Sequence, residues 1–295
     1  MSDPSPSVTV IVPAFNRVQT IQAALTSIQA QTRDDWEAIV VDDGSTDETA
    51  DKVIELAKSD PRIKLIRHAS NRGAQAARNT GIRAAKTKWV AFLDSDDRWL
   101  PSSLDLRLAA AEQHKVEVVH SYAYVLDDDG NQSLKGVPTM HGWIYREVLS
   151  RSGPVFQALL VSRDALKRID GLDENIVAMQ EWDTAIRLAK LYEFAFVPVP
   201  TFIWDCRGND TITKDRPRDA KGYEQVVRKH FWSILRYAGP DAICGHYRKL
   251  LKRYQWADAK SAALKYSLYS RIWAVPGAAG KLLPALGLIG TADRR

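Results

Sequence analysis

Trp89-Val-Ala-Phe-Leu-Asp-Ser-Asp-Asp97 is the stretch that decides the fold, because an apolar run of strand length ends abruptly in carboxylates. Two earlier segments have the same pattern. Val8–Val12 leads into Pro13-Ala-Phe-Asn16, and Ala38–Val41 leads into Asp42-Asp-Gly-Ser45. Open α/β sheets bind their ligands at the carboxyl ends of the strands. We therefore expect the three polar loops to lie along one edge of a parallel sheet.

Helices are predicted between these strands. Apolar residues recur there at helical spacing, first at Ile21, Ala24, Leu25 and Ile28 and then at Ala50, Val53, Ile54 and Ala57. Ser45 and Glu48 have the spacing of a capping box at the start of the second helix. Arg62–Arg67 is a further strand candidate, and Gly73–Lys86 is a further helix. The βαβαβ order predicts an α/β fold with right-handed crossovers and a parallel sheet.

The second half of the chain is expected to complete this domain and then to become helical. Strands are predicted at Val116–Leu126, Val155–Ser162 and Phe194–Val199, and a helix at Asp183–Leu191. From about Gly222 onward the pattern is mostly helical, with breaks at Gly239-Pro240 and at Pro276-Gly277. We therefore expect a first domain over residues 1–215 and a helical C-terminal extension over residues 216–295.

Positive charge is concentrated in the C-terminal region. The formal net charge is +5, yet Arg216 to Arg295 alone holds 16 Lys and Arg residues against 5 Asp and Glu residues. Aromatic residues accompany them at Trp232, Trp256, Trp273, Tyr237, Tyr247, Tyr254, Tyr266 and Tyr269. This composition favours contact with an anionic membrane surface. Nucleic acid is not expected, since no recognised binding module is present. An ordinary solvated helical subdomain is the alternative.

Neither a membrane-spanning helix nor a signal peptide is predicted. Ile272–Gly290 is apolar but interrupted by Lys281, prolines and glycines, whereas a spanning helix needs about 20 continuous apolar residues. Met1–Ser7 has no basic stretch followed by an apolar one. Cys206 and Cys244 lack metal-site spacing and fit a reducing compartment. We expect a cytoplasmic protein that associates peripherally with the membrane.

Asp94 and Asp96 form an Asp-x-Asp pair at the end of a predicted strand. Such carboxylates suit a hard divalent cation, Mn²⁺ or Mg²⁺, that carries a diphosphate. An EF-hand is excluded, because Arg98 stands at a ligand position and Trp99 at the glycine position. A phosphatase of the haloacid dehalogenase type is disfavoured, because Arg98 replaces its usual Thr or Val. A loop that only caps the next helix is the remaining alternative.

Asp42 and Asp43 provide two adjacent carboxylates at another strand end, which exceeds what helix capping needs. One of them could accept a hydrogen bond from a nucleobase N–H or a ribose hydroxyl. The first strand is not followed by Gly-x-Gly-x-x-Gly, and no Walker-type Gly-Lys-Ser/Thr is present. A dinucleotide site and a P-loop are therefore not supported.

Five motifs in order resemble the family 2 glycosyltransferases. They are Val10–Asn16, Val40–Asp47, Asn71–Gly73, Ala77–Asn79 with Gly81, and Phe92–Asp97. The resemblance covers Val8 to Pro101 closely and the chain to about Thr213 more loosely. It implies the A-type glycosyltransferase fold, a Rossmann-like, mostly parallel sheet flanked by helices. It also implies a nucleotide-sugar donor such as a UDP-sugar, a divalent cation and inversion at the anomeric carbon.

The resemblance also implies roles for individual residues. Nucleoside or donor contacts are expected at Pro13, Phe15, Asn16, Asp42, Asp43, Arg78 and Asp94. Phe15 replaces the commoner Tyr of the family, which keeps stacking but removes a hydroxyl contact. Asp96 would ligate the metal, and Asp94 would lie near both the metal and the ribose.

The family's general base is an acidic residue at the start of a later helix, which corresponds here to Gln180-Glu181. Asp183 is the rival. Helix positions two apart lie about 200° apart around the axis, so Glu181 and Asp183 cannot face one site. Asp183 also has Arg187 four residues on as an ion-pair partner. We therefore expect Glu181 to be the base.

Arg207 follows the last predicted strand, where a basic residue of the family often reaches the donor diphosphate; a surface arginine is the alternative. The resemblance implies transfer of a sugar to a hydroxyl of a glycan or lipid-linked acceptor, in cell-envelope glycan or polysaccharide biosynthesis. A non-catalytic sugar-nucleotide or glycan-binding protein of the same fold is the competing hypothesis.

Overall fold

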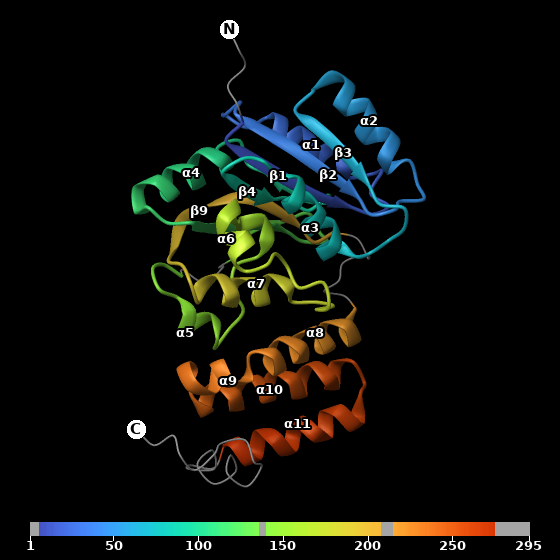
Figure 1. Ribbon diagram of the computed structural model, residues 1–295. Coiled ribbons are helices and arrows are strands. Elements are labelled where there is room, and N and C mark those ends of the chain that lie inside the picture. Colours follow the sequence, from blue (N-terminus) through green and yellow to red (C-terminus); the bar gives the residue numbers. More distant parts are fainter. Residues whose placement is uncertain (1–5, 136–139, 208–214, 275–295) are drawn as a thin grey trace. The chain divides into compact units, whose positions relative to one another are not determined.

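The computed structural model describes residues 6–135, 140–207 and 215–274 (Figure 1). The chain divides into two compact units. The first unit comprises Met1–Tyr145, Gly153–Asn175 and Gln180–Asn209. The second comprises Arg146–Ser152, Ile176–Met179 and Asp210–Arg295.

The first unit is built on one mixed sheet. Its strands are β1 (Val8–Ala14), β2 (Trp36–Asp42), β3 (Ile63–Arg67), β4 (Trp89–Phe92), β5 (Arg98–Trp99), β6 (Val118–Leu126), β7 (Gln132–Lys135), β8 (Leu160–Ser162) and β9 (Phe194–Asp205). Across the described residues the strand order is β3-β2-β1-β4-β8-β6-β9-β5, with β7 paired to β6. β1 pairs in parallel with β2 and β4, and β2 pairs in parallel with β3. The predicted parallel βαβαβ half is thus confirmed, whereas β8 runs antiparallel to both of its neighbours.

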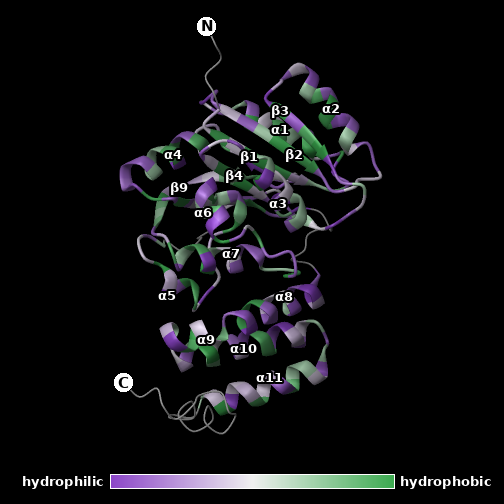
Figure 2. Ribbon diagram, in the orientation of Figure 1, coloured by the Kyte–Doolittle hydropathy of each residue, from purple (hydrophilic) through white to green (hydrophobic). Residues whose placement is uncertain are grey.

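Helices pack on both faces of this sheet. They are α1 (Ile21–Gln29), α2 (Thr49–Ser59), α3 (Ala74–Ala84), α4 (Ser103–His114), α6 (Arg163–Arg168) and α7 (Gln180–Ala189), with a short 3₁₀ helix, η1 (Phe156–Ala158). Side chains alternate along a strand. Val10 and Val12 therefore join the core beneath α1, α2 and α4, while Ile11 faces α3. A Cβ at Gly81 of α3 would lie 2.5 Å from Ile11 Cγ2, so glycine lets α3 approach the sheet. The apolar stretches of the central strands are green in Figure 2.

The second unit is helical, as expected for the C-terminal extension. Its helices are α5 (Tyr145–Val148), which begins at the last residue of a first-unit segment, α8 (Arg216–Lys229), α9 (Phe231–Ser233), α10 (Pro240–Trp256) and α11 (Lys260–Trp273), with a π-helical turn at Ile234–Ala238. Gly239 has φ +88° and Pro240 opens α10, which confirms the predicted break.

Two earlier segments, Arg146–Ser152 and Ile176–Met179, also belong to the second unit. A single boundary at residue 215 therefore does not separate the two units. Arg218 Nε donates to Val177 O over 2.8 Å, and His246 Nε2 lies 2.8 Å from Leu149 O. These contacts join residues far apart in the chain, so sequence patterns give no sign of them.

Some local predictions were wrong. The capping box does not form: α2 begins at Thr49, and Ser45 Oγ accepts a hydrogen bond from Asn16 N instead. Ile54 of α2 is 43% exposed rather than buried. The strand predicted at Val155–Ser162 is limited to β8, because the residues before it form η1.

The membrane prediction concerns residues that the structure describes only in part. Among the described residues, no helix combines the length and apolarity that crossing a membrane requires. Most of Ile272–Gly290 lies outside the described residues, which end at Ala274 in this part of the chain.

Candidate active site at the carboxyl edge of the sheet

Three carboxylates gather directly after β4. Oxygen atoms of Asp94, Asp96 and Asp97 all lie within 4.8 Å of one another. A tight turn, closed by the Asp97 N–H bonding to Asp94 O over 3.0 Å, brings them together. Burial and the neighbouring charge of Asp94 raise the pKa of Asp96. The same two causes raise the pKa of the buried Asp97 well above its ordinary value. We call these residues the acidic trio.

The three predicted loops meet at this edge, as expected. The loop after β1 contacts the loop after β2, because Asn16 N donates to Ser45 Oγ and Thr46 N donates to Asn16 Oδ1, both over 2.9 Å. It also approaches the loop after β4, because Arg17 Nε lies 3.8 Å from Asp96 Oδ2. Asn16 takes a left-handed conformation, with φ +52°.

Both oxygens of Asp94 are bound from within the chain. Arg78 Nη2 of α3 donates to Asp94 Oδ1 over 2.5 Å. Gln157 Nε2 of η1 donates to Asp94 Oδ2 over 2.7 Å and to Asp97 Oδ2 over 2.6 Å. Arg78 is thus placed beside the acidic trio. Gln157 was missed by the sequence analysis, because an isolated amide in a predicted strand carries no motif.

A buried arginine, Arg107 of α4, binds the backbone of η1. Its guanidinium donates to the carbonyl oxygens of Gln157 and Leu159, over 3.3 Å and 3.1 Å, and lies 4.4 Å from the Trp99 ring. Burial lowers the pKa of Arg107 to about 9. A buried cation is costly unless its N–H groups are hydrogen-bonded, which these contacts achieve. Arg107 therefore fixes the backbone that carries Gln157.

The predicted nucleoside residues fall into exposed and buried groups. Phe15 is 39% exposed and Asn16 is exposed, whereas Pro13 is buried at the end of β1. Asp42 is fully buried: Oδ1 accepts from Ser45 N over 3.0 Å, and Oδ2 lies 2.9 Å from Arg67 Nε. Asp42 is thus paired within the chain and shielded from solvent.

Asp43 holds a neighbouring motif in place. Its carboxylate accepts hydrogen bonds from the backbone N–H groups of Arg72 and Gly73, the shortest over 2.7 Å. His68 Nδ1 lies 2.7 Å from Asp43 Oδ1. These bonds tie the Asn71–Gly73 segment to the end of β2.

Glu181 and Asp183 have different surroundings in α7. Glu181 lies in the first turn and is partly exposed. Asp183 is buried, and its Oδ2 accepts from Arg187 Nε over 2.8 Å. Arg187 Nη1 also donates to the carbonyls of Ile169 and Gly171. The predicted ion pair between Asp183 and Arg187 is therefore present, and through Arg187 it is connected to the loop that precedes α7.

Asn79, the neighbour of Arg78 on α3, binds that same loop. Its side chain accepts from Leu172 N and donates to Leu172 O, each over 2.9 Å, and Nδ2 donates to Glu174 Oε1. Adjacent residues of one motif thus hold two parts of the site: Arg78 holds the acidic trio, and Asn79 holds the loop that precedes α7.

Arg207 lies beyond the end of β9 and is exposed. It forms a two-point ion pair with Asp205, with Nη2 2.6 Å from Oδ2 and Nε 2.9 Å from Oδ1. This hydrogen-bonded pairing lowers the pKa of Asp205. The backbone N–H of Asp205 in turn donates to Asp97 Oδ1 over 2.9 Å. Arg207 is therefore linked to the acidic trio through a single residue.

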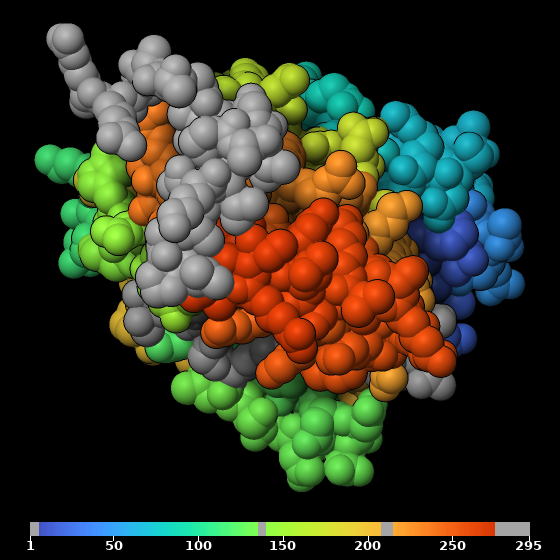
Figure 3. All heavy atoms as spheres, turned by 90° about the horizontal axis from the view of Figure 1, so that it is seen from below, coloured from blue at the N-terminus to red at the C-terminus, as the bar shows by residue number. Residues whose placement is uncertain are grey.

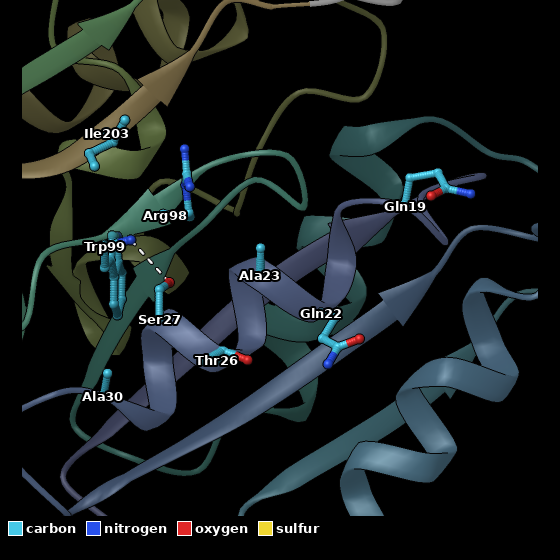
Figure 4. A pocket seen from close by; sticks show the side chains of 9 residues that line it. All are labelled: Gln19, Gln22, Ala23, Thr26, Ser27, Ala30, Arg98, Trp99 and Ile203. Atoms are coloured by element: carbon cyan, nitrogen blue, oxygen red, sulfur yellow. Dashed lines mark hydrogen bonds between the residues drawn. The ribbon is translucent and has the colours of Figure 1, made fainter. Parts of the chain in front are cut away.

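A separate depression of 620 Å³ lies beside α1 (Figure 4). It is lined by Gln19, Gln22, Ala23, Thr26, Ser27, Ala30, Arg98, Trp99 and Ile203. The hydrogen bond from Trp99 N to Ser27 Oγ joins two of its walls. None of the acidic trio lines this depression, so it is distinct from the cluster of loops at the carboxyl edge of the sheet.

Two sequence comparisons relate this chain to glycosyltransferases. The model of Glycosyl transferase family 2 matches residues 9–157. The UDP-Glc:alpha-D-GlcNAc-diphosphoundecaprenol beta-1,3-glucosyltransferase WfgD of Escherichia coli is 36% identical over 129 residues, which are 44% of this chain and 49% of WfgD. The match thus spans about half the length of WfgD. TuaG of Bacillus subtilis (strain 168), a glycosyltransferase proposed to act in teichuronic acid biosynthesis, is 28% identical over 246 residues, 81% of this chain and 97% of TuaG.

Solved structures share the fold. S. aureus TarS 1-349, crystallised in complex with UDP-GlcNAc, aligns with a TM-score of 0.67 at 19% identity, covering 96% of this chain and 84% of that one. The mannosyltransferase PcManGT from Pyrobaculum calidifontis, in complex with GDP-Man and Mn²⁺, aligns with a TM-score of 0.60 at 22% identity, covering 95% and 87%. The fold is the expected A-type glycosyltransferase fold. The ordered motifs and the family match lead to one conclusion: this chain belongs to glycosyl transferase family 2.

Proposed function

We propose that this family member is a metal-dependent, inverting enzyme that takes its sugar from a UDP-sugar. The acceptor would be a hydroxyl of a glycan or lipid-linked molecule in cell-envelope polysaccharide assembly. The acidic trio, held by Arg78 and Gln157 at the edge where the three loops meet, carries this proposal. The UDP-glucose donor for which WfgD is named and the UDP-GlcNAc bound to TarS support the choice of donor.

The residues fit a hard divalent cation. All donor atoms of the acidic trio are carboxylate oxygens, which Mg²⁺ and Mn²⁺ prefer. Within the acidic trio, the side chain of Asp96 is 35% exposed and that of Asp94 is 28% exposed, whereas Asp97 is buried. Asp96, with Asp94, would hold the ion. A bound cation would neutralise charge on the departing diphosphate.

The chain's own residues would bind and orient the donor. The exposed ring of Phe15 offers an apolar surface for the base, and the neighbouring Asn16 shapes the loop that carries it. Asp42 would accept from the nucleoside once Arg67 moves. Arg207 would leave Asp205 for the diphosphate, whose oxygens suit a planar guanidinium.

Glu181 would be the general base. Its carboxylate would take the proton from the acceptor hydroxyl while that oxygen bonds to the anomeric carbon. The bond from this carbon to the diphosphate oxygen breaks at the same time, and the nucleoside diphosphate leaves with the electron pair. Attack from the opposite face inverts the configuration. Asp183 would remain bound to Arg187 throughout.

The C-terminal region would hold the enzyme at the cytoplasmic face of an anionic membrane. A lipid-linked acceptor would be met there, and the excess of Lys and Arg from Arg216 onward would attract negative lipid headgroups.

Release of UDP from a panel of UDP-sugars tests the activity, with and without Mn²⁺ and with a bacterial lipid extract as acceptor source. Metal-dependent release, increased by the extract and giving an organic-soluble labelled product, is expected. The contrary result is tight UDP binding with no release of UDP from any donor, not even by slow transfer of the sugar to water. It would indicate a sugar-nucleotide-binding protein without catalysis.

A further inference from the structure

The inner face of α11 is fixed within the second unit. Ala263, Tyr266 and Ser270 are its buried residues. Tyr266 Oη donates to Glu224 Oε1 of α8 over 2.5 Å, and Cys244 Sγ of α10 donates to Ser270 O over 3.4 Å. These contacts determine which side of α11 faces its neighbouring helices and which side remains outside.

The outer face of α11 carries an apolar stripe. Leu264 is 73% exposed and Leu268 is 56% exposed, and Ile272 is partly exposed. These residues are spaced four apart, so they lie one above another on a helix. In Figure 3, the atoms of α11 (red) lie at the surface that faces the viewer. Because Leu264 and Leu268 are neighbours on this face, their exposed side chains form one continuous apolar patch.

Cations flank this stripe on both sides. With 3.6 residues per turn, Lys260 and Arg271 lie on one side of Leu264 and Leu268, and Lys265 lies on the other. Lys265 Nζ lies 3.3 Å from Glu224 Oε1, so its charge is partly balanced. Lys260 and Arg271 are exposed. The sequence of α11 itself contains no acidic residue, and Asp258 precedes it.

We propose that this outer face of α11 docks on an anionic lipid surface. An apolar stripe between basic flanks places leucines at the acyl boundary and cations at the headgroups. Charge complementarity selects the occupant: two copies of this face would bring like charges together, whereas anionic headgroups neutralise them. The inference rests on the proposed membrane contact of the C-terminal region, and it assigns that contact to Leu264, Leu268, Lys260 and Arg271.

Co-sedimentation with vesicles tests the apolar part. The full chain is mixed with vesicles of phosphatidylcholine and phosphatidylglycerol, or of phosphatidylcholine alone. The variant Leu264→Gln/Leu268→Gln should reduce binding to the anionic vesicles at least roughly tenfold, because two leucines lose their burial. Ile54→Gln is the matched control, since it also replaces an exposed aliphatic residue on a helix. It should bind as wild type does.

A charge series tests the basic flank. Lys260→Gln/Arg271→Gln should weaken anionic-vesicle binding roughly fivefold for each cation removed, and the loss should shrink in high salt. Lys58→Gln/Lys86→Gln removes the same charge from exposed positions of the first unit and should have little effect. Melting curves of each variant confirm that the helical unit remains folded, as substitutions at exposed positions should allow.

The outcomes separate this inference from the broader proposal. Wild type that binds anionic vesicles, with the Leu264/Leu268 variant binding equally well, overturns the α11 face and leaves membrane contact intact. Wild type that binds no anionic vesicle overturns both, while sugar transfer is unaffected. Self-association without lipid, abolished by the leucine variant, would show that a second copy covers this face and would also overturn the inference.

Discussion

The side-chain amide of Gln157 donates a hydrogen bond to Asp94 Oδ2 over 2.7 Å, although 63 positions separate the two residues. The same nitrogen donates to Asp97 Oδ2. One neutral donor therefore bridges two carboxylates whose charges repel each other, and the buried Arg107 holds its backbone. Hydrogen bonds from Gln157 and Arg78 thus hold the acidic trio together.

Gln157→Leu should expose this role. It leaves two carboxylate oxygens without their donor, which costs roughly 1–3 kcal/mol of stability for each lost bond. A bound cation would compensate for part of this loss, because its positive charge also attracts the two carboxylates. We expect a lower melting temperature in EDTA and a larger stabilisation by Mn²⁺ than in wild type, measured by differential scanning calorimetry.

Gln31→Leu is the control for this experiment. Gln31 is equally buried and makes hydrogen bonds with Ser27 O, Leu100 O and Leu104 N, away from the acidic trio. It should also lower the melting temperature, but Mn²⁺ should not restore the loss preferentially. An equal Mn²⁺ response in the two variants would contradict the bridging role of Gln157.

Asp96→Asn should stabilise the metal-free protein at neutral pH. The pKa of Asp96 is raised in the folded state by burial and by Asp94. Ionisation of Asp96 therefore costs stability. This cost is absent below the ordinary carboxyl pKa and grows as the pH rises through the raised pKa. Melting curves in EDTA should show the variant above wild type at neutral pH and equal to it in acid. A lower melting temperature for the variant than for wild type at neutral pH would contradict the claim that ionised Asp96 costs stability.

Glu181→Gln and Asp183→Asn should separate catalysis from stability. Glu181→Gln should keep donor affinity and lower turnover by about 10²- to 10⁴-fold, because an amide cannot accept the proton. Asp183→Asn breaks the buried pair with Arg187 and should destabilise the fold by about 3 kcal/mol. Initial rates and thermal melts on both variants check this. The reverse pattern would move the base to Asp183.

The second unit should lose stability in acid through His246. Burial lowers the pKa of His246 to about 4 from its ordinary 6.5. The neutral ring contacts Tyr223 Oη and Leu149 O. Stability is complete above the unfolded pKa and is lost as the pH falls toward the folded one, by roughly 3 kcal/mol.

Substitution of His246 should remove most of this acid sensitivity. His246→Gln should be less stable than wild type at neutral pH but lose less on acidification. The exposed His114 provides the comparison, since His114→Gln should keep the wild-type pH dependence. Thermal melts across the acid range give the measurement, and an unchanged pH dependence in His246→Gln would count against the assignment.

The sequence predicted the parallel half of the fold because each signal there is local. Val8–Val12, Ala38–Val41 and Trp89–Leu93 end in polar loops, and parallel strands bring such ends to one edge. The mixed half was harder to predict. β8 has only three residues, and its antiparallel pairing with β4 and β6 depends on contacts distant in sequence.

The same limit explains what was missed at the site. Asp94 and Asp96 were predicted from a motif, whereas Gln157 and Arg107 act through tertiary hydrogen bonds that no spacing encodes. Ser45 illustrates a competing interaction. Its hydroxyl fits a capping box locally, but the neighbouring loop supplies Asn16 N as a partner. The assigned roles of Glu181 and Arg207 remain predictions.

Calorimetric titration of UDP into wild type and Asp96→Asn, with Mn²⁺ and with EDTA, tests the central claim most directly. Asp51→Asn, an exposed aspartate of α2, is the control and should bind as wild type does. The acidic trio predicts tight UDP binding by wild type only when Mn²⁺ is present, and loss of that binding in Asp96→Asn while the fold is retained. Equal UDP affinity in Asp96→Asn and wild type with Mn²⁺ would contradict a metal-held donor at this site.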